Sequence, residues 1–192
     1  LSTNIYLPWS ESLIERFADR WSWGRLDRSY FLDEWEMGEP GLSSNQSLPW
    51  SETLIERYAD KWDWLGLSHN ESLPWSESLI ERYQDKWNWN GWVNYAIKDE
   101  YGCYTGDWTW VGVLGLSCNE SLPWSEAFIE RFADKWNWEV LSRNKSLPWS
   151  ESLIERFADK WDWYHFGDNR FLPWSEALIE QYPIEVVGDE EK

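Results

Sequence analysis

The sequence predicts an all-α protein, an α-solenoid of short helix-turn-helix repeats that are each about 25 residues long. Two observations favour this fold class. The segment "SLPWSESLIERYQDKWNW" at residues 72–89 has close copies along the chain, and within each copy the apolar residues follow the spacing of a helix. A fixed period of this length is typical of arrays in which each unit buries its apolar face against its neighbours.

The units are delimited by the pattern "LSxN", or a close variant of it, shortly before "LPW". Clear copies start near residues 1, 42, 67, 116, 141 and 166. Two weaker segments fill the longer gaps: "LDRSYFL" opens a truncated unit at residue 26, and "WVNYAIK" opens a degenerate unit at residue 92 that recovers the pattern at "DWTW". We therefore expect a single repeat domain over residues 1–192, with an acidic C-terminal tail at residues 184–192.

The first helix of each unit follows "LPW". One apolar stripe at helical spacing is formed by Trp75, Leu79, Ile80, Tyr83 and Trp87. Ser76 is the expected N-cap, because its hydroxyl can accept a hydrogen bond from an N–H of the first turn. Pro74 keeps the preceding residue extended, so the chain enters the helix through a fixed corner.

A second, shorter helix is expected to follow Asp85, which is a candidate N-cap, and to include the W-x-W tryptophans. The helical part of the repeat is expected to close on an asparagine, which recurs three residues after each unit start. Asparagine tolerates the left-handed conformation that ends helices, which is the simplest reason for its recurrence. The asparagines concerned are Asn4, Asn45, Asn70, Asn119, Asn144 and Asn169.

The segments "KWDWLGLSHNESLPW" (61–75) and "KWDWYHFGDNRFLPW" (160–174) resemble the tandem arrays of Trp-Asp-Trp-x-x-Leu/Ile-Ser-x-Asn units found in proteins of giant DNA viruses and of some bacteria. The resemblance covers most of the chain and is interrupted at residues 26–41 and 92–115. It implies a type of repeat, and it brings no catalytic or ligand-binding residue to this sequence.

The 20 tryptophans are expected to be mainly core. Trp75 and Trp87 lie on the apolar stripe and are predicted to be buried. The second tryptophan of each W-x-W would point about 200° away from the first if both stood on one helix. Trp89 and Trp138 are therefore candidates for partial exposure, and a row of such rings that faced a groove could stack on a sugar, a base or a peptide.

Known catalytic patterns do not occur in the sequence. The histidines are His69 and His165, which lie far apart, and no histidine pair at metal spacing, nucleophile motif, phosphate loop or calcium loop is present. Cys103 and Cys118 do not form a disulfide framework or a metal box. We therefore expect no enzymatic activity, no cofactor and no metal site.

The charge is strongly acidic, with a formal net charge of −18 and a pI near 4.4. Such a chain is poorly suited to nucleic-acid phosphates or anionic membranes, so a basic protein partner is the better expectation. No signal peptide or membrane span is visible in the sequence, which favours a cytoplasmic location. The recurring glutamates are expected to align as a negative stripe: Glu11, Glu52, Glu77, Glu126, Glu151 and Glu176.

Positions that vary between near-identical copies are the candidate binding face, because the recurring positions build the scaffold. They flank the recurring asparagine and follow W-x-W. The candidate partner-binding residues are His69, Glu71, Arg143, Lys145, Asp168, Arg170, Tyr164, His165, Trp89 and Trp138. The irregular segments at 30–40 and 101–113 are a second place for a dedicated contact.

The sequence thus predicts a non-enzymatic scaffold that binds another macromolecule, foremost a protein. The first alternative is a self-assembling array, such as a filament or coat component. Two further alternatives are a carbohydrate-binding tryptophan ladder and an acidic nucleic-acid mimic or immunity-type inhibitor. Asn45, Asn70, Asn119 and Asn144 stand in N-x-S sequons, but we interpret these as by-products, because Asn4 and Asn169 recur without one.

Overall fold

A computed structural model describes residues 1–24, 41–98, 104–166, 169 and 171–182, and in residues 91–98, 104–114, 164 and 165 it describes the backbone alone. The predicted helical character is confirmed for the repeats. The first helices of the units are α1 (Glu11–Arg16), α2 (Glu52–Arg57), α4 (Glu77–Arg82), α5 (Glu126–Arg131), α7 (Glu151–Arg156) and α9 (Glu176–Gln181). The second helices are α3 (Trp64–His69), α6 (Trp138–Leu141) and α8 (Trp163–Phe166), with the 3₁₀ turns η1 (Leu42–Ser44) and η2 (Leu116–Cys118) at equivalent places.

The first helices begin as the sequence predicts. The Ser76 hydroxyl accepts a hydrogen bond from the backbone N–H of Leu79 at 3.1 Å. The equivalent serine caps each of the remaining first helices in the same way. A glutamate follows each cap, where it favours the positive end of the helix dipole. Each of these helices is only six residues long, so packing must supply most of its stability.

The second helices begin later than predicted. Asp63 and Asn137, the middle residues of W-x-W, are the N-caps of α3 and α6, and each accepts a hydrogen bond at 3.2 Å from an N–H of the first turn. The prediction of a cap at Asp85 is wrong, because the chain makes a tight turn there, with the Lys86 N–H bonded to the Tyr83 carbonyl at 2.8 Å. The first tryptophan of W-x-W therefore lies in a turn, and the second starts the helix.

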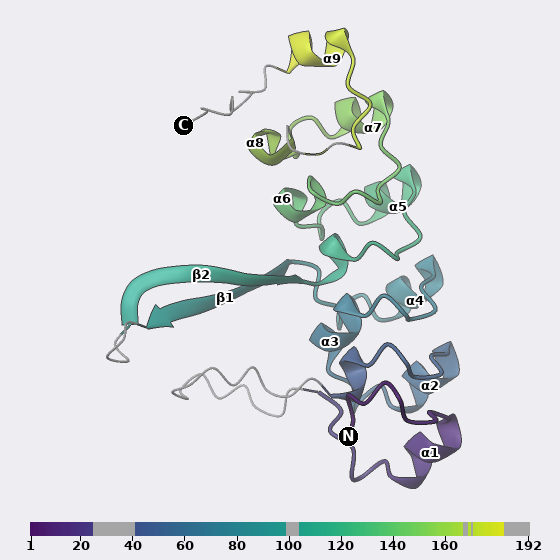
Figure 1. The fold of residues 1–192 in the computed structure, drawn as a ribbon. Helices are drawn as coiled ribbons and strands as arrows, with labels where there is room; N and C mark the ends of the chain where they lie inside the picture. The colour runs from purple at the N-terminus through teal and green to yellow at the C-terminus, as the bar shows by residue number, and fades with distance from the viewer. Residues whose placement is uncertain (25–40, 99–103, 167–168, 170, 183–192) are drawn as a thin grey trace.

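Residues 91–98 and 104–114 do not form the degenerate helical unit predicted to start at 92. They form an antiparallel hairpin of β1 (Gly91–Lys98) and β2 (Tyr104–Leu114), which projects from the helices in Figure 1. Gly91 pairs with Leu114 at its base, and the register shifts at two places along it. The truncated unit predicted at residue 26 lies mostly outside the described residues.

Both irregular segments enter the array at the same point of a unit. In the regular unit, the Leu67 N–H donates to the Asp63 carbonyl at 3.0 Å within α3. After residues 25–40, the Leu42 N–H donates to the Ser22 carbonyl at 2.8 Å, and after the hairpin the Leu116 N–H donates to the Asn88 carbonyl at 2.8 Å. The hydrogen bond that closes the second helix of a regular unit is thus also formed across each of the two irregular segments. The segments are insertions within a second helix, so the clear copies in the sequence are the units of the array.

The units stack in one column. Figure 1 shows the first helices one above another, with α1 at one end and α9 at the other, and the second helices in a parallel row from which the hairpin leaves. The core runs along the column and consists of the buried leucines, isoleucines and phenylalanines of successive units together with the first tryptophan of most W-x-W pairs. We call the row of η1, α3, η2, α6 and α8 the second-helix edge.

Candidate binding surface

The recurring asparagine joins each unit to the one before it. The Asn70 side-chain Nδ2 donates to the Ser43 carbonyl at 3.1 Å, and its Oδ1 accepts from the Ser72 N–H at 3.0 Å. Its backbone carbonyl also accepts the Trp75 indole N–H at 3.0 Å. The backbone is extended there, with φ −77° and ψ 110°, so the left-handed interpretation is wrong. The same Nδ2 bond recurs at Asn45, Asn119, Asn144 and Asn169.

This role explains why asparagine recurs whether or not a sequon surrounds it. Nδ2, the atom to which a glycan would be attached, is buried between two units and donates to a carbonyl. A glycan on Asn45, Asn70, Asn119 or Asn144 is therefore incompatible with the stacked array. The recurring serine has a matching role: the buried Ser68 hydroxyl donates to the Trp64 carbonyl at 2.6 Å and accepts from the Asn88 N–H at 2.9 Å.

The second tryptophan of W-x-W packs on the following unit and does not form an open row. The Trp89 ring lies 5.1 Å from Phe132 and 4.8 Å from Trp136, and Lys135 lies over its face at 5.5 Å. Trp138 packs in the same way on Phe157 and Trp161, at 4.9 and 4.8 Å. The expectation that these rings leave the apolar contacts is wrong, because the 200° estimate assumed both tryptophans on one helix. The expected partial exposure itself is confirmed, because both rings are half-buried.

The prediction for the other two tryptophans is confirmed for Trp87, which is buried, whereas Trp75 is only half-buried. Trp75 packs on Trp87 at 5.1 Å between ring centroids. Its indole N–H reaches the Asn70 carbonyl, while that of Trp87 reaches the Ile80 carbonyl at 3.1 Å. Unit 67 thus contributes three rings whose N–H groups are satisfied within the unit, since the Trp89 indole N–H also reaches the Gln84 carbonyl at 2.8 Å, which suits them to a structural role.

The recurring glutamates are paired with arginines of the following unit. Glu52 lies 3.6 Å from Arg82, and Glu77 lies 2.8 Å from Arg131 across the hairpin insertion. The expected negative stripe is therefore a ladder of ion pairs over much of its length. Aspartates and lysines form a second ladder, as between Asp60 and Lys86 at 3.6 Å.

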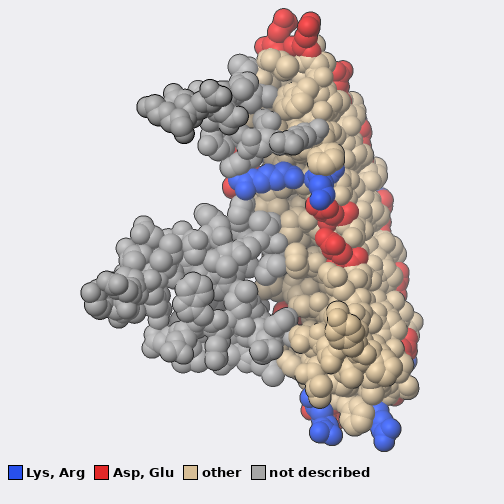
Figure 2. Space-filling model, viewed as in Figure 1, with Lys and Arg blue, Asp and Glu red and all other residues tan. Residues whose placement is uncertain are grey.

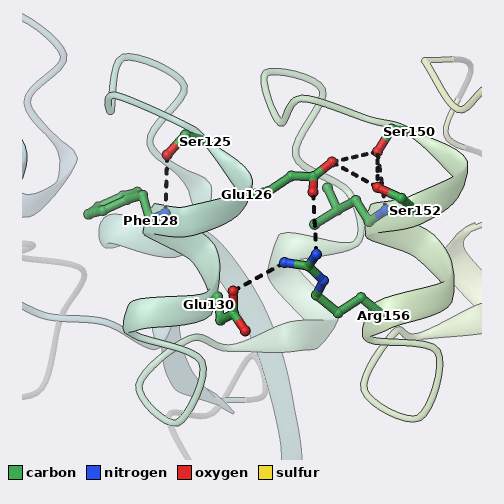
Figure 3. A network of polar contacts seen from close by, with 8 residues as sticks. Ser125, Glu126, Phe128, Glu130, Ser150, Ser152 and Arg156 are labelled. Atoms are coloured by element: carbon green, nitrogen blue, oxygen red, sulfur yellow. Dashed lines mark hydrogen bonds and ion pairs between the residues drawn. The ribbon is translucent and has the colours of Figure 1, made fainter.

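Glu126 shows the ladder in detail (Figure 3). Its Oε1 accepts hydrogen bonds from the hydroxyls of Ser150 at 2.8 Å and Ser152 at 3.1 Å, and its Oε2 lies 4.0 Å from Arg156. The hydrogen bonds from Ser150 and Ser152 lower the pKa of the Glu126 carboxyl below its ordinary value, burial opposes them, and Arg156 adds a further, smaller lowering. The contribution of Glu126 to stability is thus present above the ordinary glutamate pKa and is lost as the pH falls through the lowered one.

The varying residues around the asparagine face solvent. His69, Glu71, Arg143 and Lys145 are all exposed, on the second-helix edge or on the loop that leaves it. Arg143 lies 3.7 Å from Glu139, and Lys145 lies 3.1 Å from Glu120 of the preceding unit. Figure 2 shows a band of basic and acidic side chains across this face at the height of α6.

The remaining candidates are only partly described. Tyr164 and His165 lie in α8, where their side chains are outside the described residues, as are Asp168 and Arg170. The structure thus gathers the four exposed candidates along one edge and moves Trp89 and Trp138 into the contacts between units. Glu120 and Glu139, the ion-pair partners, occupy the same two kinds of varying position, after the asparagine and after W-x-W.

Chemistry-bearing groups are few in the described part of the chain. No group of three or more histidine, cysteine, aspartate and glutamate side chains there could hold a metal ion. Burial raises the pKa of the Cys118 thiol above its ordinary value, and its Sγ donates to the Gly115 carbonyl at 3.1 Å. A depression of about 690 Å³ lies beside Trp64, but the Lys86 cation on its rim is already placed over that ring and against Asp60.

Within the described residues, no helix is long and apolar enough to cross a membrane. Comparison of the chain with protein-family models, with curated proteins and with solved structures found no match.

Proposed function

We propose that the chain is an α-solenoid scaffold, without catalytic activity, that binds another protein along its second-helix edge. The observation that carries the proposal is that repeated and varying residues lie in different places. The repeated side chains hold one unit to the next, whereas the variation between copies concentrates at exposed positions such as His69, Glu71, Arg143 and Lys145. Repeat proteins bind through surfaces of this kind, because variation there leaves the stack intact.

The hairpin supports the same edge. It leaves the array between Asn90 and Gly115, where the unit would otherwise continue its second helix, and the stack continues beyond it. Because the hairpin does not disturb the stacking of the units, it is free to make a contact of its own with the partner protein. Residues 25–40 enter at the equivalent point of the first unit, so both insertions begin on the proposed binding edge.

The charges favour a protein over the other partner classes. The edge carries both signs within a short distance, since Arg143 lies 3.7 Å from Glu139 and Lys145 lies 3.1 Å from Glu120. Mixed charges suit a protein surface better than a polyanion. An acidic nucleic-acid mimic needs carboxylates that are not already paired, and the ion-pair ladder weighs against it. A carbohydrate-binding ladder needs exposed aromatic rings, and the packing of the tryptophans between units weighs against it.

The test uses substitutions that the array already contains. Arg143→Ser with Lys145→Gln copies the unit that carries Ser44 and Gln46, so the fold should be retained. The wild-type chain is used to capture partners from native cells, and the affinity of the purified partner is then measured for both chains. We expect at least about a tenfold loss of affinity for the edge variant. The control variant Glu56→Gln with Glu81→Gln, on the first helices, should bind as the wild type does. Equal binding by the edge variant and loss of binding by the control would overturn the proposal.

A further inference from the structure

The hairpin of β1 and β2 lacks the further strands that a small sheet needs for stability. Its sheet has two strands, and among the described residues no other strand pairs with either outer edge. Figure 1 shows the hairpin projecting from the row of second helices. A two-stranded hairpin is only marginally stable in water, whereas three or more strands with an apolar face are stable. The hairpin is therefore suited to accept a strand from another molecule.

The two outer edges of the hairpin differ in regularity. In β2, Val111 has no counterpart in β1, and further along residues 105–107 stand against Ile97 alone. Extra residues of this kind bend a strand and disrupt pairing along its edge. β1 (Gly91–Lys98) carries no extra residue, so its backbone keeps the regular spacing that a new strand requires. The outer edge of β1 is therefore the better edge for pairing.

The sequence of β1 complements itself when two copies run antiparallel. With Tyr95 opposite the Tyr95 of a second copy, which we call the Tyr95 register, Val93 lies opposite Ile97. Trp92 then lies opposite Lys98, the one charged residue of β1, so no like charges meet. Aromatic residues that face each other across strands are favourable, and a lysine is attracted to the face of a tryptophan.

The Tyr95 register also keeps one face of the hairpin continuous across both copies. Asn94 pairs with Trp110, and Ala96 pairs with Trp108. Since alternate residues of a strand belong to one face, Trp92 belongs to the same face as these two tryptophans. Even-numbered residues of one β1 lie opposite even-numbered residues of the other, so the tryptophan faces of both copies form one surface. A shift by one residue would place them on opposite sides of the sheet.

We propose that two copies of this chain pair along the outer edges of their β1 strands, in the Tyr95 register, and form a four-stranded antiparallel sheet. The contact is isologous, because each copy contributes the same strand, so it closes at a dimer. Residues 92–98 of each copy take part, and an edge of this length is smaller than the interface of a permanent dimer, so the association is reversible. Each chain has a net charge of −18, and salt screens the repulsion between two such chains.

Sedimentation velocity of the 192-residue chain at rising concentration tests the dimer. We expect the average mass to approach that of two chains, and added salt to strengthen the association. Val93→Glu and Ile97→Lys each place a charge opposite an apolar residue at two points of the dimer, so each should move the onset of association to a concentration about tenfold higher. Within the hairpin Val93 pairs with Gly112 and Ile97 falls within a shift of register, so neither change removes a regular side-chain pair there.

A mixture of the two variants distinguishes strand pairing from a loss of the hairpin. In the mixed dimer the new glutamate lies opposite the new lysine, and Ile97 of one chain lies opposite Val93 of the other, so association should recover. An unfolded hairpin would not be rescued in this way. The Arg143→Ser, Lys145→Gln chain, altered on the second-helix edge, is the control and should dimerise as the wild type does. The dimer and the binding of a partner protein are thus tested independently.

Crosslinking tests the register. Tyr95→Cys, in a background of Cys103→Ser and Cys118→Ser, places two thiols at opposite positions, where Cβ atoms are about 4.5–5.5 Å apart. Mild oxidation should give a covalent dimer. Val93→Cys, on the same face, lies opposite Ile97 and away from its own counterpart, so it should stay unlinked. A chain that is monomeric at every concentration would leave the edge to a strand of another protein and would overturn the proposal, as would a mixture that does not recover association or equal crosslinking at both positions.

Discussion

At the scale of single residues, the recurring asparagine is the most constrained side chain of the repeat. Asn144 is buried, donates through Nδ2 to the Ser117 carbonyl at 3.1 Å and accepts through Oδ1 from the Ser146 N–H at 2.9 Å. An amide is suited to this position because it offers a donor to one unit and an acceptor to its own chain. The sequence shows that the position is fixed, but the reason for it lies in a neighbouring unit and becomes visible only in the structure.

Removal of this amide should be costly. Asn144→Ala leaves the Ser117 carbonyl and the Ser146 N–H without their partners, and we expect a loss of about 2–4 kcal/mol in the free energy of unfolding. Asn144→Asp should be at least as damaging near neutral pH, because a carboxylate cannot donate to the carbonyl. Urea unfolding followed by circular dichroism measures both. Arg143→Ser, on the exposed neighbouring residue, should change stability by less than about 0.5 kcal/mol, and a comparable loss there would argue against the assigned role of Asn144.

At the scale of elements, the six-residue helices depend on the rings between them. Trp64, Trp89 and Trp138 each start or precede a second helix and lie on the next unit, so one residue type links secondary structure to stacking. The first helix could be predicted well, because its cap and apolar stripe are local signals. The start of the second helix was predicted too early, because Asp85 is a capable cap in sequence, whereas in the structure the chain turns there and the cap is the middle residue of W-x-W, as at Asp63.

The second tryptophan provides the test at this scale. Trp138→Ala removes the ring that packs on Phe157 and Trp161 and the surface over which Lys160 lies at 5.5 Å. We expect the free energy of unfolding to fall by about 2–4 kcal/mol. This is less than the loss of a fully buried tryptophan would cause, because Trp138 is half-buried. Tyr6→Ala, which removes an exposed ring, should cost less than about 0.5 kcal/mol. The unfolding midpoint in urea, followed by far-ultraviolet circular dichroism, compares the two, and equal small effects would show that the contact contributes little.

At the scale of the whole molecule, the array is continuous through its irregular segments. Unit 67 contacts unit 116 directly: Asn119 donates to the Ser68 carbonyl at 3.0 Å, and Arg131 pairs with Glu77 at 2.8 Å. The same bonds join units that follow each other without an insertion. The repeat period could therefore be read from the sequence, and with it the order of the stack.

The nature of the insertions was harder to predict. "DWTW" at residues 107–110 matches the W-x-W pattern, so residues 92–115 look like a degenerate copy of the repeat in the sequence. The runs "WVNYAIK" and "YTGDWTWVGV" are nevertheless rich in β-branched and aromatic residues and flank a glycine, which is typical of a hairpin. The two interpretations differ in what lies between units 67 and 116: a further stacked unit in one case, and nothing but their own interface in the other.

Distances between spin labels at Glu56, Glu81 and Glu130 distinguish the two directly. These exposed residues occupy the same position in units 42, 67 and 116, and Cys103→Ser with Cys118→Ser supplies a background without native thiols. Electron paramagnetic resonance on the labelled pairs 56/81 and 81/130 gives the two separations. The structure predicts equal distances, because both pairs span one interface between units. A separation for 81/130 about twice that for 56/81 would place an additional unit in the column, and it would contradict the continuous stack on which both proposals rest.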